Sequence, residues 1–152
     1  MQFREILKQS FVILGFSAPG KWSGEMVHPI PDLLDQSYKE FGKDKENIIG
    51  VCLPPRSDHY FYTCGIEIEE VDFHKVKKGM TLHTFPEQRY FVFTHIGNAN
   101  EIPNTYGQIW EIFDRKGYSI KKGMPEIEVV KSQMFGKEYT NEYEMEIWIP
   151  VN

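Results

Sequence analysis

Apolar positions near the C-terminus alternate with polar ones, as they do in a β-strand with two different faces. Residues 143–152 follow this period throughout. One face would carry three apolar side chains, from Met145, Ile147 and Ile149. Glu146 and Trp148 would share the opposite face, together with Glu144. The segment therefore predicts a strand that presents a carboxylate beside an indole.

This acidic and aromatic face has two interpretations. It is either a solvated strand face or the floor of a binding pocket. If the face is covered, ionised Glu146 needs a cation or hydrogen-bond donors, because a lone buried charge costs several kcal/mol or more. A lipophilic cationic ligand would supply that partner, and the Trp148 ring would add roughly 0.5–2 kcal/mol of cation–π attraction.

The same succession of patterns occurs twice along the chain: a strand, a helix that begins near a proline, and two further strands. Both helical patterns stop at a glycine, Gly42 in the first half and Gly117 in the second, where a C-terminal stop belongs. The strands of the first half would be 11–15, 48–53 and 61–68, and those of the second half 90–97, 127–131 and 143–151.

The two halves keep a constant offset, which predicts a duplicated fold. Gly15 lies 82 positions before Gly97, and Phe61 lies 82 positions before Tyr143. We expect an α+β fold of one domain over residues 1–152. It would contain two β-α-β-β units related by a pseudo-twofold axis, at about 9–68 and 88–151, with 71–80 crossing between them. The two helices would cover one face of an antiparallel sheet, leaving a ligand cleft between the halves.

Composition narrows the class of function. The net charge of −5 argues against nucleic-acid binding, which needs a basic face. Aromatic residues make up 22 of 152 positions, a surplus that suits a bulky core or an aromatic-lined cavity. Cys52 and Cys64 have no CxxC spacing and are expected to be reduced. With no signal peptide or membrane span visible, we expect a cytoplasmic protein.

Motifs for metals and cofactors are missing from the sequence. The five histidines show no ligand-like spacing, and there is no HExxH, GxSxG, GxGxxG or phosphate loop. We therefore expect no metal and no cofactor. No helix-turn-helix fits beside the two repeated units, so a DNA-binding regulator would need a partner chain, whose identity is unknown.

Three blocks of sequence resemble the GyrI-like family, also called the AraC-type effector-binding domain. Residues 61–68 resemble the family's aromatic-x-x-x-Gly-x-Glu strand. Residues 78–80, 85–86 and 90–97 resemble its "Gly-Met … Pro … Tyr-Ala-Val-Phe-x-His-x-Gly" run. Residues 146–151 resemble its closing "Glu-Ile-Tyr-Ile-Pro-Val", and in this order the blocks span nearly the whole chain.

The resemblance implies a cleft that binds bulky, lipophilic, cationic compounds for sensing or sequestration, with Glu146 as the acidic residue. The expected ligand-binding residues are Glu146, Trp148, Trp110, Tyr62, Tyr90 and Trp22. A packing role is the alternative for each aromatic residue. The chain departs from the family pattern at Trp148, where Tyr is commoner, and at Val130, where an aromatic often stands.

The sequence is also compatible with two other functions. Some GyrI-like proteins hydrolyse electrophilic cyclopropanoid compounds in the same cleft, and this would need only a carboxylate and a hydroxyl donor, such as Glu146 with Tyr62 or Tyr90. Other members inhibit gyrase, where the acidic surface would act instead. Turnover of an electrophile and inhibition of supercoiling, respectively, would identify these functions.

Overall fold

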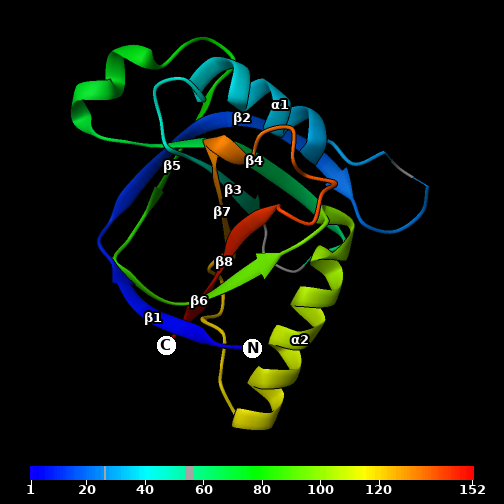
Figure 1. The fold of residues 1–152 in the computed structure, drawn as a ribbon. Helices are drawn as coiled ribbons and strands as arrows, with labels where there is room; N and C mark the ends of the chain where they lie inside the picture. The colour runs from blue at the N-terminus through cyan, green and yellow to red at the C-terminus, as the bar shows by residue number, and fades with distance from the viewer. Residues whose placement is uncertain (26, 54–56) are drawn as a thin grey trace.

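The computed structural model describes residues 1–25, 27–53 and 57–152, which form one antiparallel sheet and two main α-helices (Figure 1). The strands are β1 (Phe3–Lys8), β2 (Phe11–Lys21), β3 (Asn47–Leu53), β4 (His59–Ile68), β5 (Thr81–Phe85), β6 (Gln88–Ile96), β7 (Ile127–Lys131) and β8 (Glu144–Val151). The helices are α1 (Ile30–Phe41) and α2 (Ile102–Lys116), and three short 3-10 turns cover Glu70–Lys75, Ala99–Glu101 and Ser132–Met134. Within the described ranges, no helix is long and apolar enough to cross a membrane.

The strand order confirms the duplicated α+β fold. The sheet runs β1-β6-β8-β7-β3-β4-β2-β5, so that β3 and β7 lie side by side at its centre. The first unit is β2-α1-β3-β4 and the second is β6-α2-β7-β8. Ile49 of β3 pairs with Val129 of β7, and the two halves extend from this pair in opposite directions with matching order. The pseudo-twofold axis therefore passes between the two central strands.

Two strands were not predicted from the sequence, β1 and β5, and they interlock the two halves. β1 leads directly into β2 of the first unit but pairs with β6 of the second. β5 leads directly into β6 but pairs with β2. Three charged residues interrupt β1, and threonine and histidine fill much of β5, so neither segment shows a clear apolar alternation. Each half thus supplies the edge strand of the other.

The sheet is strongly curled. β1 and β2, and likewise β5 and β6, follow each other around the bend, as the blue and green strands show (Figure 1). At the point where β2 pairs with β4, Gly15 faces Gly65. A Cβ added to Gly65 would lie 1.9 Å from the carbonyl oxygen of Leu14, so the two backbones approach more closely than any side chain would allow.

Both helices lie on one face of the sheet, as predicted, and this is the outer face of the curl. Each has a proline in its first turn, Pro31 in α1 and Pro103 in α2, where the missing N–H is not needed. They end at Gly42 and Gly117. Their apolar stripes pack on the sheet in a buried core that includes Leu33, Tyr38, Phe41, Ile109, Ile112 and Phe113.

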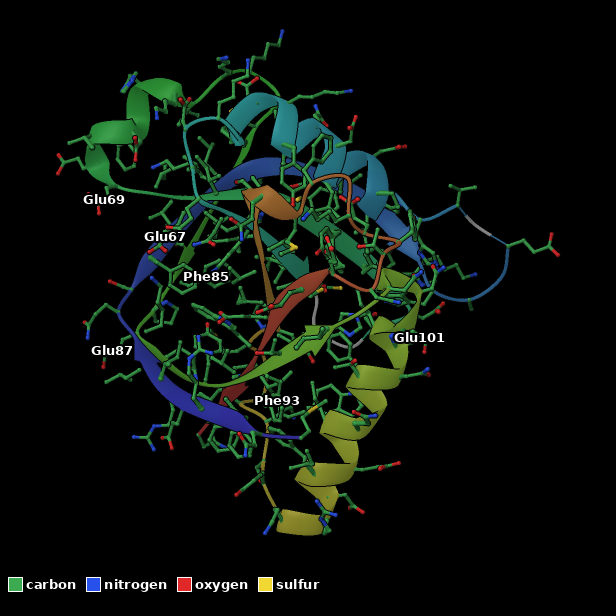
Figure 2. All side chains as sticks on the ribbon, viewed as in Figure 1. Glu67, Glu69, Phe85, Glu87, Phe93 and Glu101 are labelled. Carbon is green, nitrogen blue, oxygen red and sulfur yellow. The ribbon has the colours of Figure 1, made fainter. Side chains whose placement is uncertain are left out.

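The inner face of the curl contains a second buried core, formed by side chains of the sheet itself. Its members are Phe11, Ile13, Ile49, Val51, Phe85, Tyr90, Val92, Ile127 and Val129. Phe85 stacks on Phe11 with ring centroids 4.9 Å apart and lies inside the curl, whereas Glu87 lies at its outer rim (Figure 2). The face without helices is therefore filled by the protein's own side chains.

On the last strand of each unit, strand pairing gives a correspondence between the two units that differs by one residue from the 82-residue sequence offset. Gly65 pairs with Ile49, and Glu146 pairs with Val129, so Gly65 and Glu146 occupy equivalent places in the two units. Tyr143 is then equivalent to Tyr62 and not to Phe61. This difference matters because a shift of one residue moves a side chain to the other face of a sheet.

Candidate ligand-binding cavity

A cavity of about 780 Å³ lies between the outer face of the sheet and the N-terminal halves of α1 and α2. Ile30 and Leu34 of α1 form one wall, and Tyr106 and Trp110 of α2 form the other. The central strands β3 and β7, with β4 and β8, form the floor. This volume is within the range of sites that enclose drug-sized ligands.

Glu128 on β7 is the carboxylate at the centre of the floor. It is directly opposite Gly50 of β3 in the sheet. The hydroxyl of Tyr62, which comes from β4, donates a hydrogen bond to Glu128 Oε1 at 3.2 Å. The Glu128 side chain is partly buried, and it borders the cavity.

Burial changes the acidity of this group. The pKa of Glu128 is raised from an ordinary 4.5 to about 7. Loss of water on burial is the largest cause, the hydrogen bond from Tyr62 opposes it, and the nearby carboxylate of Glu126 adds a smaller upward shift. Glu128 is therefore a carboxylate that would gain much from a positive charge in the cavity. The same burial raises the pKa of Tyr62 and Tyr106 well above 10, so both phenols keep their protons at neutral pH.

Seven aromatic side chains among the described residues line the cavity. They are Trp22, Tyr62, Tyr106, Trp110, Phe135, Tyr139 and Tyr143. Tyr106 and Trp110, one helical turn apart on α2, have ring centroids separated by 6.0 Å. Trp110 also contacts Phe113 edge to face, and this contact fixes its ring against the core.

The charged residues of the lining are acidic. Asp35, Glu126, Glu128 and Glu138 border the cavity, and no lysine or arginine does so among the residues whose positions are described. Glu126 lies directly before β7 and Glu128 lies within it, and both border the cavity. The arrangement favours positively charged ligands over negatively charged ones.

Three rings stack at the mouth of the cavity. Trp22 lies over Tyr60 with centroids 4.4 Å apart, and His28 lies 4.9 Å from Trp22. The hydroxyl of Tyr60 and Nδ1 of His28 share a hydrogen bond of 2.7 Å. The loop is held further by Ser23, whose backbone N–H and hydroxyl both donate to Asp58. Trp22 is half exposed, with one ring face against this stack.

Three of the six expected ligand-binding residues line the cavity. They are Trp22, Tyr62 and Trp110. The side chains of the other three, Glu146, Trp148 and Tyr90, belong to the opposite, inner side of the sheet.

Glu146 has partners of its own on that side. Arg4 of β1 forms an ion pair with it at 2.6 Å, and the indole N–H of Trp148 donates to it at 2.9 Å. Tyr90 is completely buried, and its hydroxyl has no hydrogen-bond partner among the described residues. The alternating pattern correctly placed Glu146 and Trp148 on the same face of β8. Alternation alone does not determine which face of the sheet borders a cavity.

Glu128 was not among the residues expected from the sequence. A signal for it does exist, because it interrupts an otherwise apolar run, Ile127 to Val130, in a predicted strand that the structure places at the centre of the sheet. A central strand of a covered sheet has few wet positions, so an acidic residue within it needs a functional partner. Glu144 and Glu146 on β8 made the last strand appear the more acidic one.

Known proteins share both the sequence and the fold. The family Cass2, integron-associated effector binding protein, matches residues 6–151. Transcriptional regulator BrlR of Pseudomonas aeruginosa is 28% identical over 130 residues, which cover 82% of this chain and 46% of BrlR. The chain thus spans under half the length of this relative.

Solved structures agree with the fold at low sequence identity. SAV2435 bound to tetraphenylphosphonium has a TM-score of 0.76 at 17% identity, with 100% of this chain and 94% of that one covered. A hydrolase from Listeria innocua has a TM-score of 0.61 at 14% identity, with 99% and 92% covered. The family match extends over both repeated units and every strand and helix that forms the cavity. The chain therefore belongs to the Cass2 family of GyrI-like effector-binding proteins, a family of small-molecule binders.

Proposed function

We propose that this protein binds bulky lipophilic cations in the cavity, with Glu128 as the counter-charge and the aromatic lining as the apolar surface. The observation that carries the proposal is a partly buried carboxylate at the floor of an aromatic-lined cavity. Its hydrogen-bond partner among the described residues is one phenol, that of Tyr62. Ionised Glu128 in an empty cavity is poorly solvated, and a cationic ligand relieves that cost.

The aromatic rings supply the second part of the recognition. Trp110 and Tyr106 offer π faces to a cation from one wall, and Trp22 offers another at the mouth. Aryl groups on the ligand would bury apolar area against the same rings, which contributes about 25 cal/mol per Å². The related protein SAV2435 has been observed with tetraphenylphosphonium, a cation of this type.

A pair of ions with nearly the same shape tests the proposal directly. Tetraphenylphosphonium and tetraphenylborate carry the same four phenyl groups around opposite charges. Calorimetric titration at pH 8 should show binding of the phosphonium and no measurable binding of the borate. Equal affinities would mean that the cavity recognises apolar bulk alone, and the counter-charge role of Glu128 would be abandoned.

Hydrolysis of an electrophilic small molecule is the second candidate. It is favoured by the same pair, since Glu128 has a pKa of about 7 and lies 3.2 Å from a phenolic donor. Glu128 would accept a proton from water as the water oxygen attacks a strained ring carbon. A carbonyl group conjugated to the ring would receive the electrons of the broken ring bond, and the Tyr62 hydroxyl would turn from Glu128 to donate its proton in a hydrogen bond to that carbonyl oxygen. A hydrolase from Listeria innocua shares the fold.

Mass spectrometry of an activated cyclopropane incubated with the protein distinguishes the two functions. A hydrolase would add one water to the compound at a rate that falls in Glu128→Gln and Tyr62→Phe. A binding protein would return the compound unchanged.

A further inference from the structure

The bond between Tyr62 and Glu128 spans three strands of the sheet. Tyr62 belongs to β4 and Glu128 to β7, and β3 lies between them. The phenol must therefore extend across β3 to reach the carboxylate. It passes over Gly50, the residue of β3 that pairs directly with Glu128.

Gly50 leaves the space that the phenol occupies. A Cβ built on Gly50 would lie 1.8 Å from the hydroxyl oxygen of Tyr62 and 2.6 Å from the ring carbon that carries it. No side chain fits there while Tyr62 keeps its position. The atoms in conflict are the far end of a side chain and not backbone, so Tyr62 would move and the strand would remain.

The equivalent place in the other half of the molecule has neither the glycine nor the carboxylate. Tyr143 is the counterpart of Tyr62, Val130 that of Gly50, and Ile48 that of Glu128, because the pairs Gly50–Glu128 and Ile48–Val130 flank the central pair symmetrically. All three of these residues also line the cavity. One end of the floor is thus apolar, and the end that contains Gly50 has the carboxylate.

We propose that Gly50 is a positioning residue of the cation site. Because Gly50 has no side chain, the Tyr62 hydroxyl can cross β3, reach Glu128 and favour the ionised form of Glu128. The effect of Gly50 on ligand binding rests on the proposed function, because ionised Glu128 is the group that attracts the cation. The geometric part of the inference, the dependence of Glu128 on Gly50 through Tyr62, holds for the empty protein.

In the described part of the chain, five other titratable groups interact with Glu128 and stay constant in the test. They are Glu126 directly before β7, Cys52 on β3, Cys64 on β4, Tyr106 on α2 and Tyr143 directly before β8. Gly50→Ala changes none of these side chains. Gly107→Ala is the matched control, because a Cβ on Gly107 of α2 meets nothing within 4 Å.

The experiment is a carboxyl-carbon NMR titration of Glu128 in the ligand-free protein. Gly50→Ala should raise the midpoint by about half a pH unit or more, the effect of losing one hydrogen bond to the charged form. Tyr62→Phe should raise it by a similar amount, and Gly50→Ala added to Tyr62→Phe should raise it no further. Gly107→Ala should leave it unchanged. An unchanged midpoint in Gly50→Ala, or additive shifts in the double variant, would overturn the proposal.

A stability cycle keeps the proposal testable if Gly50→Ala alone folds poorly. In the Tyr62→Leu background the end of the ring is missing, so Gly50→Ala should then lower the melting temperature little. If Gly50→Ala destabilises the wild-type protein and Tyr62→Leu equally, Gly50 is required by the backbone of β3 and not by the position of the Tyr62 ring. Tetraphenylphosphonium binding, measured in parallel, distinguishes failure of this inference from failure of the proposed function. If the wild-type protein does not bind the phosphonium, the proposed function is refuted. If the Glu128 midpoint is unchanged in Gly50→Ala, only the role of Gly50 is refuted.

Discussion

Two glutamates on neighbouring strands, β7 and β8, differ in their surroundings more than in their sequence context. Glu128 faces the cavity with a phenol as its hydrogen-bond partner. Glu146 faces the inner side of the sheet, where Arg4 and Trp148 both bind its oxygens. Glu146 has its partners within the protein, whereas Glu128 borders the space that a ligand would fill.

The same substitution at the two positions should therefore give different results. Glu128→Gln removes the charge at the cavity floor and should weaken tetraphenylphosphonium binding by about tenfold or more, as expected for loss of a partly buried ion pair worth on the order of 1–3 kcal/mol. Glu146→Gln should change the affinity less than twofold. Calorimetric titration of both variants at pH 8 measures this, and a larger loss in Glu146→Gln would return the ligand-binding role to β8.

The acidity of Glu128 also predicts how stability depends on pH. Its pKa is about 7 in the folded protein and 4.5 ordinarily, so between these values the folded state holds a proton that the unfolded chain has released. The stabilising effect of this proton is complete below pH 4.5 and is lost as the pH rises through 7, and its size is about 3 kcal/mol.

Urea unfolding at pH 5 and pH 8 tests this difference. The free energy of unfolding of wild-type protein should fall towards pH 8 by more than that of Glu128→Gln, which has no proton to lose. Identical falls in the two proteins would show that Glu128 ionises normally.

At the scale of elements, α2 is held in place by a buried histidine. His95 of β6 donates from Nε2 to the carbonyl oxygen of Gly97 at 3.0 Å, and its Nδ1 accepts from the hydroxyl of Thr105 at 2.6 Å. Thr105 lies in the first half of the helix, directly before Tyr106, which lines the cavity. The contact fixes the distance between the sheet and this wall of the cavity.

Thr105→Val should leave Nδ1 of His95 without a partner while preserving the shape of the side chain. We expect a loss of about 1–3 kcal/mol in the free energy of unfolding, the cost of one unsatisfied buried polar atom. Thr84→Val on β5, at an exposed position, is the control and should change stability by less than about 0.5 kcal/mol. Chemical unfolding of both variants measures the difference, and equal stabilities would remove the anchoring role of His95.

At the scale of the whole molecule, the exchange of β1 and β5 makes each half incomplete without the other. Residues of the first unit pair with β5, and residues of the second pair with β1. The central contact of β3 with β7 joins the units again. We propose that residues 1–152 form a single cooperative unit, in agreement with the one-domain expectation.

If the chain is one cooperative unit, its two halves should unfold together. A variant that keeps only Trp22 reports on the first half, and one that keeps only Trp148 reports on the second. Their fluorescence transitions in urea should have the same midpoint, because neither sheet half keeps its edge strand alone. Two separate midpoints would show that the units fold independently.

The sequence alone determined the repeated order of elements and the class of fold. The 3.6-residue and 2-residue periods, the proline starts and the glycine ends are local signals, and the structure confirms both helices and six of the eight strands at these places. The segments for β1 and β5 carry too little apolar alternation to be recognised. They become strands because their backbone groups find partners in the opposite half.

Only the tertiary structure decided which carboxylate faces the cavity. Alternation separates the two faces of β8, but the face that becomes the cavity depends on where the helices pack and how far the sheet curls. The one-residue shift that makes Tyr62 the counterpart of Tyr143 comes from strand pairing and not from spacing along the chain. Glu128, Tyr62 and Gly50 come from three different strands, so their site exists only once long-range pairing places those strands side by side.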